Sequence, residues 1–263
     1  MKRILFIGIV LLSVQNAKSQ FAINASYQNS IVNMRPAVSD GNGFDLKVFY
    51  GPNQKRLNIG IAVARSYYGA KRAPVQFTAY DGSVVNTNVK VNNNYTNVGL
   101  YSRYKLAKGT NNILTPFIES KLGYGFLSTR INIEEPMDIT NCDPVQPNTV
   151  YQDKTWTAYG GMGLDLKLTG LITKEKENRS IKTYLTFSAG YSTGGRISYF
   201  NPEHADMSGG QHSGSNSKSG EPVPYYAAFM NTQTQTQHEH AIGYLYTSSL
   251  SMAEFKLGFS LRF

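Results

Sequence analysis

Four pairs of an acid and a lysine, spaced two residues apart, are the side chains best placed for acid–base chemistry. They are Asp45 with Lys47, Glu119 with Lys121, Asp165 with Lys167, and Glu254 with Lys256. In an extended strand, residues two apart point to the same side, so each pair would share one face. Such pairs could act as acid–base catalysts or as a proton path. Structural ion pairing in an enclosed space is the interpretation that we expect.

The four histidines are the next candidates, because imidazole binds metals and exchanges protons near neutral pH. All lie in the long segment before the last predicted strand: His204, His212, His238 and His240. His238 and His240 could share a metal from one side of a strand, but exposed loop histidines are the expected state. The segment also holds serines, yet no spacing pairs a nucleophile with a base. We therefore expect no enzyme, no catalytic residue, no metal site and no cofactor.

The elements that would position the acid–lysine pairs are extended strands. Segments of alternating apolar and polar residues recur along the chain, each suited to crossing a bilayer as a tilted strand of about 9 to 11 residues. Short connections follow the second, fourth and sixth segments, and long connections follow the first, third, fifth and seventh. The predicted strands are 20–28, 43–50, 56–64, 94–106, 113–128, 155–168, 181–192 and 253–263.

One stretch leaves the number of strands open. Residues 72–91 contain Asp81-Gly82 between two alternating arms, which is a strong hairpin signal. The arms could form a hairpin that projects above a membrane, leaving eight spanning strands, or they could add two strands to give ten. Because the first arm is short, weakly apolar and interrupted by Pro74, we expect eight.

The N-terminus has the pattern of an export signal. A basic start at Lys2 and Arg3, an apolar run over 4–14 and a small-residue cleavage motif predict a signal peptide over 1–19. The mature chain, 20–263, would be a single domain. It would carry 23 basic and 17 acidic residues, a net charge of +6. For an exported protein with scattered basic residues, this charge favours anionic lipid headgroups over nucleic acid as the partner.

The last predicted strand alternates to the end of the chain. In a soluble sheet its apolar face would be buried, whereas in lipid a closed barrel satisfies its backbone groups and turns the apolar face outward. A final alternating strand that ends in Phe resembles the assembly signal of outer-membrane β-barrel proteins. With the leader and the strand rhythm, the chain resembles small barrels of the OmpX, OmpA and OmpW type and, more narrowly, the PorT-like family. The assembly signal comprises Phe255, Leu257, Phe259, Leu261 and Phe263.

The predicted fold class is all-β. We expect a closed antiparallel transmembrane β-barrel of eight strands, with ten as the alternative, short periplasmic turns and long extracellular loops. The interior of such a barrel is just wide enough for side chains to fill. Charged residues on the inner face therefore predict a network of ion pairs that plugs the lumen. Its members are Asp45, Lys47, Arg103, Lys105, Glu119, Lys121, Asp165, Lys167, Lys182, Glu254, Lys256 and Arg262.

The resemblance implies a structural, adhesive or complex-forming component of the bacterial outer membrane, and the PorT-like family implies a link to protein secretion machinery. The expected partners are outer-membrane lipid including lipopolysaccharide, the barrel assembly machinery, and a protein bound through the long loop at about 195–247. The second half of that loop alternates like a strand prolonged beyond the membrane. An OmpW-like transporter of small apolar molecules, with an apolar lumen patch and a lateral opening, is the first alternative. A lipid-modifying outer-membrane enzyme is the second.

Overall fold

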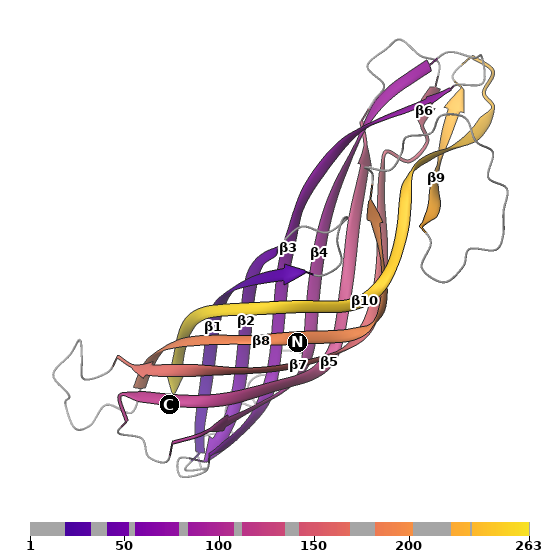
Figure 1. Ribbon diagram of the computed structural model, residues 1–263. Helices are drawn as coiled ribbons and strands as arrows, with labels where there is room; N and C mark the ends of the chain where they lie inside the picture. The colour runs from indigo at the N-terminus through magenta and orange to yellow at the C-terminus, as the bar shows by residue number, and fades with distance from the viewer. Residues whose placement is uncertain are drawn as a thin grey trace, which may run out of the picture.

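The computed structural model describes residues 19–32, 41–52, 56–78, 84–107, 112–134, 142–168, 182–201, 222–231 and 233–262. Regular structure in these ranges is entirely β, in one antiparallel sheet of ten strands (Figure 1). Across these ranges, no helix is long and apolar enough to cross a membrane. The predicted signal peptide lies outside the described residues, except for Ser19, the first residue of the first strand.

The strands are long for a globular protein, where about five or six residues is usual. Several have 20 residues or more, and the last has 26. The strands are β1 (Ser19–Val32), β2 (Gly41–Pro52), β3 (Leu57–Thr78), β4 (Val84–Lys105), β5 (Leu114–Ile133), β6 (Cys142–Pro144), β7 (Asn148–Lys167), β8 (Lys182–Asn201), β9 (Val223–Asn231) and β10 (Gln237–Arg262).

Eight of the strands form a circuit of pairings. The order is β1-β2-β3-β4-β5-β7-β8-β10, and β10 pairs in turn with β1. Each of these strands therefore has a hydrogen-bonded neighbour on both sides in the part of the molecule that we call the proximal half. The proximal half comprises β1, β2, 57–67, 94–105, 114–126, 154–167, 182–193 and 251–262.

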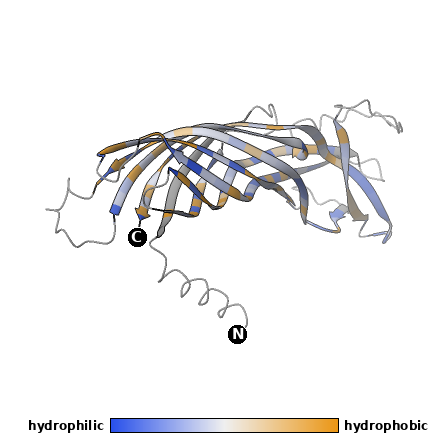
Figure 2. Ribbon diagram, turned by 90° about the horizontal axis from the view of Figure 1, so that it is seen from below, coloured by the Kyte–Doolittle hydropathy of each residue, from blue (hydrophilic) through white to orange (hydrophobic). Residues whose placement is uncertain are grey.

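Hydrophobic and hydrophilic residues are interspersed along the strands (Figure 2), and in the proximal half buried and exposed side chains alternate along each strand whose burial is described. The predicted apolar face is exposed: Leu100 is 68% exposed, Leu122 64% and Phe259 57%. The opposite, polar face is buried, with Arg103 and Asp165 fully covered. This half is therefore polar inside and apolar outside, as predicted from the alternation.

The hairpin arms at 72–91 do not form separate strands. Residues 70–78 continue β3 and residues 84–92 continue β4, and the two segments pair with each other. The turn at 79–83 lies outside the described residues. A register shift between Tyr67 and Ala70 marks where β3 leaves the circuit, and a second shift between Ser249 and Ser251 marks the same level on β10.

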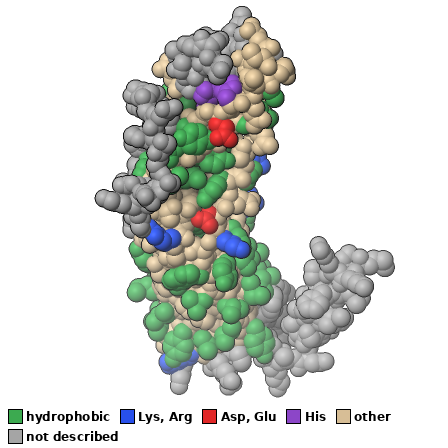
Figure 3. Space-filling model, turned by 90° about the vertical axis from the view of Figure 1, so that its right-hand side faces the viewer, with side chains coloured by type: hydrophobic (Ala, Val, Ile, Leu, Met, Phe, Trp, Pro, Cys, Tyr) green, Lys and Arg blue, Asp and Glu red, His purple; other side chains and the backbone are tan. Residues whose placement is uncertain are grey.

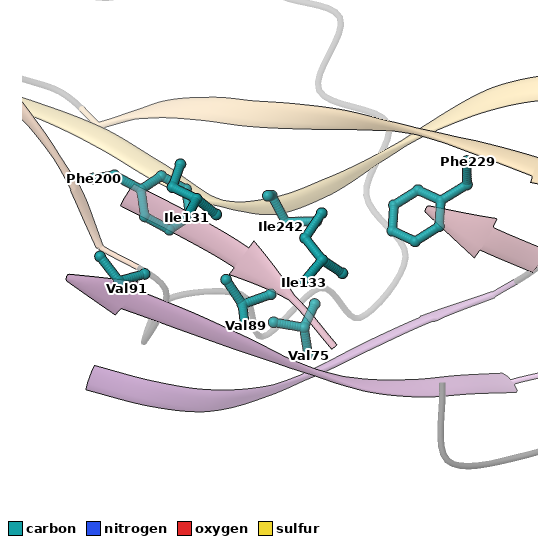
Figure 4. Close-up of a cluster of buried hydrophobic side chains, with 8 residues drawn as sticks. All are labelled: Val75, Val89, Val91, Ile131, Ile133, Phe200, Phe229 and Ile242. Carbon is teal, nitrogen blue, oxygen red and sulfur yellow. The ribbon is translucent and has the colours of Figure 1, made fainter. Parts of the chain in front are cut away.

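Beyond these shifts the strands separate into two layers, which we call the distal half (upper right in Figure 1). One layer contains β3, β4, β5 and β7, and the other contains β8, β10, β9 and β6. The layers enclose an apolar core. That core comprises Val75, Val89, Val91, Ile131, Ile133, Phe200, Phe229 and Ile242 (Figure 4). The distal half comprises 70–78, 84–92, 127–133, 142–153, 196–201, 223–231 and 237–249.

Candidate functional site: a filled interior beneath a two-layer platform

The buried charges of the proximal half form one continuous chain of ion pairs in which acids and bases alternate. Its eight members come from five strands, and each is 5% exposed or less. Nζ of Lys47 lies 2.9 Å from Glu119, and the Arg103 guanidinium lies 3.2 Å from Asp165. In order, the chain runs Glu254, Lys256, Asp45, Lys47, Glu119, Arg103, Asp165 and Arg262.

Hydroxyl groups donate to the carboxylates of this chain. Tyr101 and Tyr159 donate to the two oxygens of Glu119 at 2.7 and 2.8 Å. Thr186 donates to Asp165 at 2.8 Å, and Ser192 donates to Glu254. Because burying a carboxylate is costly unless it is paired and hydrogen-bonded, these donors offset part of the cost of burying the acids.

Aromatic rings lie against the cations. The Arg103 guanidinium lies 3.8 Å from the ring centroid of Phe117, and Nζ of Lys256 lies 4.0 Å from that of Tyr159. The Arg262 guanidinium lies 3.9 Å from the centroid of Tyr184. These distances fit cation–π contacts, which strengthen when desolvated. The aromatic packing is a feature that the strand alternation did not predict.

The other four predicted network residues are all lysines. Lys121 is buried in the interior, with Nζ 5.8 Å from the ring centroid of Tyr159. Lys167 is also buried, whereas Lys105 and Lys182 are only partly covered. The structure therefore places all twelve side chains away from the apolar outer face, and it joins at least the eight residues named above in one chain.

The interior remains filled between the ion pairs and the distal core. A second apolar cluster occupies this level, and the hydroxyl of Tyr68 donates to the sulfur of Met252 at 3.0 Å. The cluster comprises Tyr68, Tyr95, Leu127, Ile197, Tyr199, Leu250 and Met252. In the described residues, buried side chains thus follow one another from the ionic chain to the distal core.

The predicted assembly-signal residues lie on the outer face of β10. Phe255, Leu257, Phe259 and Leu261 are all exposed, while the residues between them are buried. Phe263 lies outside the described residues. Figure 3 shows that apolar side chains gather thickly at the proximal end, with Lys and Arg side chains at the upper margin of this zone.

Two of the four histidines can be placed. His238 and His240 lie on β10 with ring centroids 4.7 Å apart, and the His240 ring packs on Phe229. Burial, together with the neighbouring His238, lowers the pKa of His240 to about 4. Within the described ranges, no group of three potential ligands could hold a metal ion. His204 and His212 lie outside those ranges.

Much of the segment predicted as a loop at about 195–247 is strand. β8 continues to Asn201, β9 occupies 223–231 and β10 begins at Gln237. The extension of β10 agrees with the alternation in 237–246, but β9 and the short β6 were not predicted. β9 pairs with both β10 and β6, so this segment builds one layer of the distal half.

Neither protein-family models nor curated proteins match this sequence. Among solved structures, the chain is similar to Ail, the attachment invasion locus protein of Yersinia pestis, in complex with the heparin analogue sucrose octasulfate: 11% identity, covering 93% of this chain and 97% of that chain, TM-score 0.35. It is also similar to the N-terminal β-barrel domain of Pseudomonas aeruginosa OprF, at 11% identity, 92% and 96% coverage and TM-score 0.32. The transport unit of the autotransporter AIDA-I from Escherichia coli is similar at 12% identity, with 94% of this chain and 91% of that chain covered and a TM-score of 0.32. Identities and scores this low assign no function.

Proposed function

We propose that this chain is an eight-stranded, closed β-barrel of the bacterial outer membrane, with a plugged lumen and a structural, adhesive or complex-forming role. The proximal half crosses the membrane, and β1 and β10 close the barrel. The distal half stands outside the cell as a rigid platform. Because the number of strands is even, the N- and C-terminal ends of the barrel's chain both lie on the periplasmic side.

The reversal of polarity along single strands is the observation that carries this proposal. On β5, Leu122 faces outward at 64% exposure and Lys121 faces inward at 4%. Farther along the same strand, Ile131 is fully buried and Arg130 is exposed. Burial of apolar surface is favourable in water, so the distal half is arranged as a water-soluble sheet. The proximal half has the opposite arrangement, which hydrocarbon favours.

The filled interior supports a structural role over an open pore. Arg103, Tyr101 and Phe117 are each 1% exposed or less. The interior of an eight-stranded barrel is only wide enough for side chains to fill, so large buried side chains such as these leave little room for a channel. Planar-bilayer recording tests this role. Protein whose insertion is verified by protease protection should give no large, stable conductance. A large and stable conductance would contradict the plugged barrel.

The distal half is the surface that we propose for recognition. One of its two layers is built largely by a segment that a plain barrel does not need, and its layers can present long strands to a partner. Because the sequence resembles the PorT-like family, a component of a secretion complex is the first partner to test. Cross-linking in native membranes should capture one protein through the distal half. The same cross-linking should be carried out on a chain lacking 202–221 and its products compared with those of the full chain.

Passage of small apolar molecules is a second candidate, favoured by one observation. An apolar hollow of about 670 Å³ lies on the proximal half across β5, β7, β8 and β10, and Phe117, Gly163 and Lys256 are among the residues that line it. Uptake of an apolar dye into proteoliposomes tests this role. If it operates, Ala189→Phe, in the hollow, should slow uptake more than Ala158→Phe, outside it.

A further inference from the structure

A polar groove of about 640 Å³ lies on the outer face of β3, β4, β5 and β7. Arg65 lines one part of it and Arg130 another, and both side chains are exposed. Between them the lining is rich in amide and hydroxyl groups, from Asn94, Thr96, Ser128 and Gln152. Among the described residues that line the groove, none carries a carboxylate. The groove therefore presents two cations and several neutral hydrogen-bonding groups.

The strand register places this groove at the border of the apolar zone. One row of paired residues on the outer face is apolar, running through Val63, Val98 and Tyr124. The next row contains Arg65, paired with Thr96. Farther toward the distal half, Tyr67, Asn94 and Ser128 form a third row, and Arg130 pairs with Asn92 and Val150 in a fourth.

The position of the groove selects its ligand class. Under the proposed function, the apolar rows contact acyl chains, so the rows directly above them face the headgroups of the outer leaflet. Guanidinium groups bind phosphate through paired, charge-assisted hydrogen bonds. Amide and hydroxyl side chains between two guanidinium groups suit the hydroxyls and amides of a sugar.

We propose that this groove binds the phosphorylated sugar headgroup of an outer-leaflet glycolipid, the class that includes lipopolysaccharide. Arg65 holds a phosphate at the membrane border, and Arg130 holds a second anionic group farther out. This inference rests on the proposed function, because it needs the proximal half to be embedded in lipid. It names a site on the outer wall that is separate from the plugged interior and from the distal core.

Binding of lipid A to the protein in phosphatidylcholine nanodiscs, followed by native mass spectrometry, tests the proposal. The double variant Arg65→Gln/Arg130→Gln should bind lipid A at least about tenfold more weakly than the wild type, because two charge-assisted contacts are lost. Lys90→Gln/Lys154→Gln is the matched control, since it removes two positive charges from exposed sites on β4 and β7 that do not line the groove. It should change binding by less than about twofold. Heat-modifiable migration checks that each variant is folded.

Dephosphorylated lipid A, the double arginine variant, inorganic phosphate and insertion into nanodiscs separate the possible outcomes. Equal binding of dephosphorylated lipid A by the wild type, or unchanged binding by the double arginine variant, would overturn the inference. Displacement of lipid A by inorganic phosphate at an equal concentration would show a site for free phosphate and would also overturn it. Failure of the folded wild type to enter nanodiscs would sink the membrane proposal and this inference together. An embedded protein that ignores lipid A would overturn this inference alone.

Discussion

Lys256 on β10 and Asp45 on β2 meet with 2.9 Å between Nζ and Oδ2, although β1 lies between their two strands. The pair spans the junction at which the last strand returns to the first. Both side chains are buried, and Asp45 also lies 3.6 Å from Lys47. This contact links the ends of the strand circuit by charge as well as by backbone hydrogen bonds.

Replacing both partners of this pair should cost less than the sum of the two single replacements. Asp45→Asn leaves the Lys256 ammonium buried beside a neutral amide and should lower the free energy of unfolding by about 3–5 kcal/mol. Asp45→Asn combined with Lys256→Met should lose less than the sum of the two single variants. Urea unfolding, followed by fluorescence of Trp156, the only tryptophan, measures this. Strict additivity would mean that the two groups do not interact.

Gly163 should tolerate a side chain much less well than Gly160, three residues earlier on β7. A Cβ at Gly163 would clash with the Phe187 carbonyl and the Phe117 ring, whereas a Cβ at Gly160 meets nothing within 4 Å. Gly163→Ala should therefore cost about 1–3 kcal/mol through overpacking, and Gly160→Ala should be close to neutral. The same unfolding assay compares the two variants. Equal losses would show that the interior has room at this level.

Acidification should weaken the distal half through His240. The pKa of this imidazole is lowered to about 4 in the folded chain, from an ordinary value of 6.5, by burial and by His238. The unfolded state therefore binds more protons between these values, so stability is full above pH 6.5 and declines as the pH falls toward 4. Hydrogen exchange of β9 and β10, corrected for intrinsic rates, should show this loss.

His240→Phe is the control for that experiment, because it keeps a ring against Phe229 and removes the titrating group. Its distal half should lose less protection over the same pH range. If wild type and variant respond identically, another group causes the response and the assignment to His240 fails.

The period-two alternation was enough to predict which charges face inward, because residues two apart on a strand must share a face. It could not predict that Lys47 meets Glu119 from β5 at 2.9 Å, since the partner depends on register across several strands. It also could not predict which solvent a face contacts. Val89 and Val91 alternate like the exposed apolar residues of β4, yet both are buried in the distal core.

Two further features escaped sequence reasoning for physical reasons. β9 contains Tyr225, Tyr226 and Phe229 without a clear alternation, because both of its faces are partly covered. On β8, the register shift opposite Ser249 and Ser251 inserts one extra residue at Gly194-Gly195. Such a bulge reverses the side of the sheet on which the later residues of the strand lie. An apolar–polar alternation that is extrapolated from the residues before the bulge therefore assigns the wrong face to the residues after it.

In the proposed function, the outer face of the proximal half contacts hydrocarbon while the distal half contacts water. Phe259 and Tyr226 test it directly, because the two side chains are similarly exposed, at 57% and 51%, in the two halves. The measurement is the free energy of folding into lipid vesicles of Phe259→Arg and Tyr226→Arg. Phe259→Arg should lose about 2–4 kcal/mol and Tyr226→Arg less than about 1 kcal/mol. Equal losses, or folding of both variants in water without lipid, would contradict the account.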